Sequence, residues 1–94
     1  MDVRFHEDPD TELPHIFGHG ITEEAVLEVL RGPGDDYPAK RDSRMKMGQT
    51  VAGRYLQVIY VPDDDGIGVF VITAFELTGN RKKAFRRRQR RKKP

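Results

Sequence analysis

The sequence predicts an α+β fold: a three- to four-stranded antiparallel meander with N-terminal helices and a basic C-terminal helix. Apolar residues recur with a helical period over residues 21–31 and with the two-residue period of strands over residues 37–75. The connections within residues 37–75 are too short for parallel crossovers, which favours antiparallel pairing. A chain of 94 residues supports one small core, so we expect a single domain over residues 1–85 and a basic tail over residues 86–94.

The N-terminal part of the chain predicts a short strand over residues 2–6 and one or two helical turns within residues 11–18. The clearest helix covers residues 23–31. Thr22 has the side chain of an N-cap, and Gly32 is typical of a residue that ends a helix.

Strands are expected over residues 37–41, 44–50, 54–61 and 67–75, and a last helix over residues 79–90. The predicted core consists of Phe5, Ile16, Val26, Val29, Leu30, Met45, Leu56, Val58, Val69, Val71 and either Phe75 or Ile72. The two longest strands carry apolar side chains on both faces. One face should pack against helices, and the other should be covered by a helix or by another chain, for example in a homodimer.

Composition excludes several classes of protein. Without cysteine, the chain has no disulfide, no cysteine-bound zinc, no iron–sulfur cluster and no thiol nucleophile. No apolar run approaches the roughly 18 residues that span a membrane, and the acidic N-terminus does not resemble a signal peptide, so we expect a cytoplasmic protein with no membrane partner. His15 and His19 have the spacing of a metal-ligand pair, but Gly18 interrupts them and a third ligand is missing, so no metal and no cofactor is predicted.

The net charge of +2 conceals an uneven distribution. Residues 81–94 contain ten Lys and Arg and no acidic residue, so residues 1–80 have a net charge of −8. Such a basic block is typical of segments that bind nucleic acid, although it can also fold against the acidic body or remain without a role. The predicted nucleic-acid-binding residues are Arg81, Lys82, Arg86, Arg87, Arg88, Arg90 and Arg91.

Three segments resemble BrnT-type toxins, small bacterial proteins of the RelE/ParE toxin superfamily. They are His19-Gly20-Ile21-Thr22 before an acidic helix start, the paired strands of residues 44–60, and residues 71–86 with their basic helix. A related family of small uncharacterised domains shares the same plan. The resemblance implies a RelE/ParE-like fold, metal-independent cleavage of RNA, and a small antitoxin protein as partner.

Other positions depart from the BrnT pattern. Gly18 replaces a lysine, Phe75 replaces an arginine after the last strand, and Arg81-Lys82 replaces Glu-Arg at the start of the last helix. The plan of the chain favours an endoribonuclease toxin. The altered positions favour a non-catalytic module of the same fold that binds nucleic acid or protein through its basic tail, so whether the protein is an enzyme stays open.

Metal-independent RNA cleavage needs a base for the 2′-hydroxyl, an acid for the leaving 5′-oxygen, and cations for the phosphorane. Arg44 and Lys46 lie about 7 Å apart on one strand face and would point outward together if Met45 and Met47 faced the core. Each candidate could instead have a structural role. His19 could cap the helix that follows it, Arg44 and Lys46 could belong to a solvated strand face, and Tyr55 could pack within the sheet. The candidate catalytic residues are His19, Arg44, Lys46, Arg54 and Tyr55.

Overall fold

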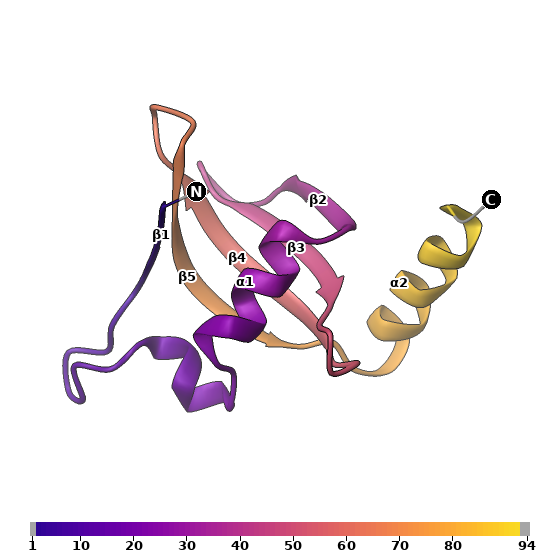
Figure 1. Cartoon of the computed structure of the whole chain (residues 1–94), viewed down its shortest axis with the longest axis horizontal. Coiled ribbons are helices and arrows are strands. Elements are labelled where there is room, and N and C mark those ends of the chain that lie inside the picture. The colour runs from indigo at the N-terminus through magenta and orange to yellow at the C-terminus, as the bar shows by residue number, and fades with distance from the viewer. Residues whose placement is uncertain (1, 93–94) are drawn as a thin grey trace.

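Five strands form one mixed sheet in the computed structural model, which describes residues 2–92 (Figure 1). The strand order is β1-β5-β4-β3-β2. Along the chain the elements are β1 (Asp2–Phe5), the 3-10 helix η1 (His15–His19), α1 (Glu23–Arg31), β2 (Gly34–Pro38), β3 (Arg44–Gln49), β4 (Tyr55–Pro62), β5 (Gly68–Glu76) and α2 (Gly79–Lys92).

The predicted α+β class and the antiparallel meander are confirmed for β2 to β5, but the sheet has a fifth strand that the prediction did not pair. β1 lies parallel to β5, with Val3 opposite Val69. The argument from short connections applies only to strands that follow one another in the chain. β1 and β5 are joined through the rest of the domain, which supplies the long crossover that parallel pairing requires. Of the predicted N-terminal helices, one is the single 3-10 segment η1 and the other is α1.

The edge strand β2 covers Gly34–Pro38, so it begins three residues before the strand expected over residues 37–41. Gly34 pairs with Gly48 of β3, and a Cβ atom on Gly34 would lie 2.1 Å from the carbonyl oxygen of Met47. Only glycine permits this approach. This early start places Asp35 and Asp36 on a strand.

The helix α1 has the predicted bounds and packs against one face of the sheet (Figure 1). The Ala25 amide donates to the Thr22 Oγ1 atom at 3.2 Å, as expected for an N-cap. Ile21 and Val26 flank this cap and are 1% and 0% exposed. The predicted core residues that are buried are Ile16, Val26, Val29, Leu56, Val58, Val69 and Val71, and the others are half-buried.

The other face of the sheet is covered in part by α2, as the apolar character of both faces predicts. Phe85 is 1% exposed and forms a second cluster with Met47 and Leu77. Ile59 and Phe70 stay half-buried on the part of the sheet that α2 does not reach. A homodimer that covers them remains a prediction.

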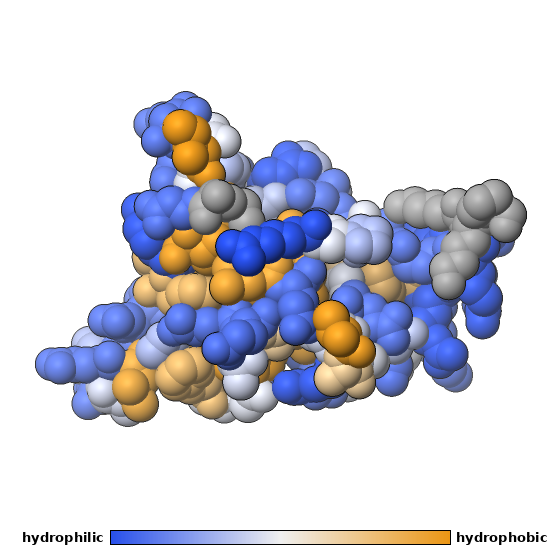
Figure 2. Space-filling model, viewed as in Figure 1, coloured by the Kyte–Doolittle hydropathy of each residue, from blue (hydrophilic) through white to orange (hydrophobic). Residues whose placement is uncertain are grey.

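The face of the molecule shown in Figure 2 is mostly hydrophilic, and its apolar side chains lie in small groups separated by polar ones. Of the two α-helices, α1 is short and α2 is strongly polar. Within residues 2–92, no helix has the length and hydropathy that crossing a membrane requires.

Candidate nucleic-acid interface

The helix α2 lies beside the sheet, to its right in Figure 1, and an apolar and a polar contact hold it there. Phe85 provides the apolar contact. The polar contact is made by Asp35 of β2, which accepts hydrogen bonds from Arg88 Nε at 2.5 Å and from Gln89 Nε2 at 3.2 Å. The basic segment is therefore a helix docked on the sheet, and it is helical through Lys92, two residues beyond the predicted end. Positions 93 and 94 of the expected tail lie outside the described residues.

The outward side of α2 is strongly cationic. Lys83, Arg86, Arg87 and Arg90 surround a shallow hollow of about 210 Å³, and Arg91 is exposed beyond them. Among the described side chains, Arg88 is the one α2 cation that forms an ion pair with a carboxylate. The acidic body therefore does not neutralise the outward cations, contrary to one of the alternatives that the sequence leaves open.

Tyr55, a candidate catalytic residue, lies beneath α2 rather than among the other candidates. Its ring packs edge-on against Phe85, with the centroids 6.0 Å apart. Lys82 Nζ and Arg86 Cζ lie 5.2 and 5.8 Å from the centroid of the Tyr55 ring. These are cation–π contacts, which hold two of the predicted RNA-binding cations at the surface without removing their charge.

Lys46 does not form an outward phosphate site with Arg44, so that prediction is wrong. The Lys46 side chain is 9% exposed, and its Nζ atom donates to the carbonyl oxygens of Leu30 at 2.9 Å and Gly32 at 2.6 Å. Lys46 thus caps the C-terminal end of α1, where a cation is favourable, although its burial lowers its pKa. The methionine face is buried too, because α2 covers it, so alternation along β3 does not separate a core side from a solvent side.

Arg44 is engaged with an acidic partner. Its Nε atom donates to Asp36 Oδ1 at 3.1 Å, and this hydrogen bond raises the pKa of Arg44. The Tyr60 hydroxyl donates to the other carboxylate oxygen of Asp36 at 2.6 Å. Burial of the phenol, together with the bond to Asp36, raises the pKa of Tyr60 to about 12.

Replacing Tyr60 by Phe should therefore change stability at alkaline pH. The fold favours the neutral phenol, so this contribution is present below pH 10 and disappears as the pH rises toward about 12. The parent should lose on the order of 2 kcal/mol more than Tyr60→Phe over this range, at about 1.4 kcal/mol per pKa unit. Urea unfolding of both proteins at several pH values measures the difference. Equal loss in both proteins would contradict the assignment.

The histidines form a hydrogen-bonded chain with a carboxylate. Asp8 Oδ1 lies 2.8 Å from His15 Nδ1, and the two Nε2 atoms of His15 and His19 lie 3.3 Å apart. If Asp8 accepts from His15 Nδ1–H, then His15 Nε2 is an acceptor, and we assign the proton between the rings to His19 Nε2. Within residues 2–92, no group of three or more His, Asp or Glu side chains has metal-binding geometry.

Arg54 lies at the same corner of the molecule as His19. One guanidinium nitrogen donates to the carbonyl oxygen of Gly20 at 3.2 Å, and Arg54 Nε donates to Glu76 at 2.8 Å. The structure therefore brings together His19 and Arg54 of the five candidates. Arg44 is bound to Asp36 of β2, Lys46 caps the C-terminal end of α1, and Tyr55 lies below α2.

Sequence reasoning missed several polar residues of these sites. Asp8 follows Glu7 and Asp36 follows Asp35 in turn-like segments, and nothing in their local pattern distinguishes them from solvated acidic residues. The spacing of His15 and His19 was a usable signal, although it indicated a ligand pair rather than a hydrogen-bonded chain. Comparison with protein-family models, with curated proteins and with solved structures gives no match to this chain.

Proposed function

We propose that this protein binds RNA through the outward cations of α2. The observation that carries the proposal is that Lys83, Arg87 and Arg90 are exposed on one side of a docked helix and form no ion pair with a described carboxylate. Cations that are free before binding release the counterions of the phosphates that they contact, and this release drives association. The resemblance to BrnT-type toxins supports RNA as the nucleic acid.

The arrangement of charge favours binding at one end of the molecule. Residues 1–80 have a net charge of −8 and repel phosphates, while α2 attracts them. Guanidinium and ammonium groups on a helix face contact phosphates rather than base edges, so this part of the binding is independent of sequence.

A matched pair of triple variants tests the proposal. Lys83, Arg87 and Arg90 are changed to Gln in the first, and the control changes Arg31, Lys40 and Arg41, which are also exposed. The parent should bind a single-stranded RNA with a slope of log K against log salt of about −3 to −5. The α2 variant should lose about 2 units of that slope, at roughly 0.7 per phosphate contact, because three contacts are removed. Fluorescence anisotropy at several salt concentrations measures both. Equal slopes for the two triple variants would overturn the proposal.

A second candidate function is cleavage of the bound RNA, as in a BrnT-like toxin held inactive by a small antitoxin protein. The chain Asp8–His15–His19 favours it, because a carboxylate orients one imidazole and a second imidazole lies within hydrogen-bond reach. Two imidazoles can supply the base and the acid of metal-independent RNA cleavage. The proposed cleavage depends on the histidine corner, which consists of Asp8, His15 and His19, and not on Arg44 and Lys46 of β3.

A further inference from the structure

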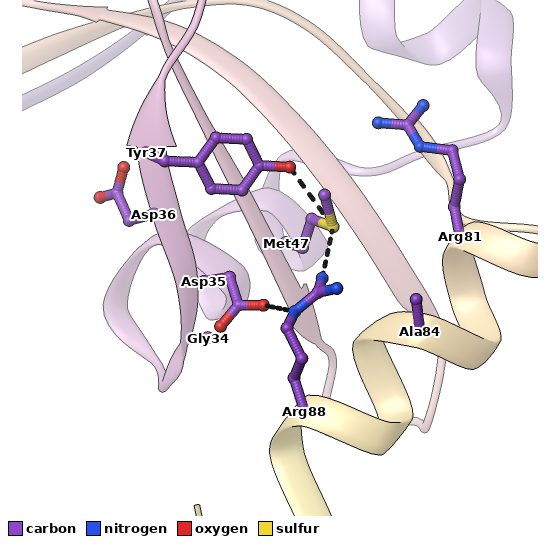
Figure 3. Close-up of a pocket in the computed structure, with 8 residues that line it drawn as sticks. All are labelled: Gly34, Asp35, Asp36, Tyr37, Met47, Arg81, Ala84 and Arg88. Carbon is purple, nitrogen blue, oxygen red and sulfur yellow. Dashed lines mark hydrogen bonds and ion pairs between the residues drawn. The ribbon is translucent and has the colours of Figure 1, made fainter.

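A cavity of about 710 Å³ separates β2 from α2 (Figure 3). Tyr37 forms its wall on β2, Met47 contributes from β3, and Arg81, Ala84 and Arg88 line it from α2. Pockets that hold small organic ligands have volumes of roughly 300–1,000 Å³. The cavity therefore has room for one nucleotide unit, and it opens beside the helix that carries the proposed RNA interface.

Two polar groups that face this space have only weak partners. The Tyr37 hydroxyl lies 3.9 Å from Met47 Sδ, and an Arg81 guanidinium nitrogen lies 3.8 Å from Met45 Sδ. A thioether sulfur is a weak acceptor, so both groups keep most of their hydrogen-bonding capacity for a ligand. Figure 3 shows the Tyr37 ring and the Arg81 guanidinium extending from opposite walls into the space between β2 and α2.

The remaining charged groups hold the cavity open rather than fill it. Asp35 receives hydrogen bonds from Arg88 and Gln89, which clamp α2 to β2. The Asp36 carboxylate is bound by Arg44 and Tyr60 and points away from the cavity in Figure 3. A clamp of this kind preforms the space, and it leaves Arg81 as the lining cation without a carboxylate among the described residues.

We infer that the cavity between β2 and α2 holds one nucleotide of a bound RNA, with its base stacked on Tyr37 and its phosphate at Arg81. An aromatic ring is the usual platform for an unstacked RNA base, and a guanidinium is a strong phosphate donor. This inference rests on the proposed RNA binding and adds a base-dependent contribution to it. The outward cations of α2 interact only with the charge of the phosphates, whereas binding in the cavity requires a planar base.

Two oligomers of equal length and charge separate the two contributions. One is a short single-stranded oligoadenylate RNA, and the other is its abasic counterpart with the same number of phosphates. The parent should bind the first about 5- to 150-fold more tightly, the range expected for stacking one base on an aromatic side chain. Both oligomers should show the same salt slope, because both present the same phosphates to α2.

Three variants test whether the cavity causes the preference for the oligoadenylate over its abasic counterpart. Ala84→Leu fills the cavity without a change of charge, and Tyr37→Ala removes the platform, so each should bind the two oligomers equally. Tyr37→Phe retains the ring and should retain most of the preference. Tyr37 lies on an edge strand and is 36% exposed, so its variants should keep the fold, which thermal unfolding monitors.

The outcomes distinguish this inference from the function on which it rests. If the parent binds both oligomers equally, or if both Ala84→Leu and Tyr37→Ala keep the preference, the cavity does not hold a base, and RNA binding by α2 stands. If the parent binds neither oligomer, the proposed function itself is wrong. A preference that disappears in Ala84→Leu and Tyr37→Ala and persists in Tyr37→Phe supports the inference.

Discussion

Replacing Phe85 by Ala is expected to lower the free energy of unfolding by about 3–5 kcal/mol, the usual cost of deleting a buried aromatic side chain. Phe85 is 1% exposed and packs against Met47, Leu77 and the ring of Tyr55. Within residues 79–91, Phe85 is the buried side chain of α2, and the rest of the helix is largely charged. Its loss should therefore undock the helix as well as open a cavity.

Phe17→Ala is the matched control, because Phe17 is 45% exposed and lies in η1. Exposed positions usually change stability by about 0.5 kcal/mol or less. Urea unfolding followed by circular dichroism reports both the free energy and the helix content. Similar losses in the two variants would show that α2 is not anchored through Phe85.

Local signals allowed some elements to be predicted to the residue. The bounds of α1 follow from the Thr22 cap and from Gly32 after its last turn, and both signals lie within the element or beside it. The pairing of β1 with β5 depends on residues more than sixty positions apart, which no local pattern records. The start of β2 at Gly34 depends on a close approach to Met47 of the neighbouring strand, so the sequence of β2 alone reads as a loop.

In the candidate site, too, local patterns predicted one part of the arrangement and contacts between distant residues decided the rest. Composition was sufficient to identify a cationic C-terminal segment, but the inward turn of Arg88 depends on Asp35, 53 residues earlier. The burial of Lys46 depends on the end of α1, 14 and 16 residues away, so a strand pattern alone could not reveal it. Residue type predicted which side chains could bind phosphate or act in catalysis, and tertiary contacts decided which of them are accessible for such a role.

If the protein cleaves RNA, His15→Ala and His19→Ala should each reduce the rate about 10²- to 10⁴-fold, the range that general acid–base groups contribute. Asp8 orients His15 through Nδ1, which leaves His15 Nε2 as the base for a 2′-hydroxyl. The leaving 5′-oxygen needs an acid, and His19 supplies it as the imidazolium, which donates its Nε2 proton and becomes the neutral ring. The substrate must replace the hydrogen bond between the two imidazole rings. Asp8→Asn should weaken cleavage with little effect on RNA binding, because Asp8 contacts His15 and the cations proposed to bind RNA lie on α2.

Arg44→Gln is the contrasting variant. Arg44 is bound to Asp36 in a different part of the molecule, so cleavage at the histidine corner should continue in this variant at close to the parent rate. The assay uses a labelled RNA and the same oligomer with 2′-deoxyribose at every position, which lacks the attacking hydroxyl and should stay intact. Loss of cleavage in Arg44→Gln with retention in both histidine variants would move the active site to the strand face. A parent that binds the RNA without cleaving it would leave a binding module, with the histidine corner serving only to hold η1 against the sheet.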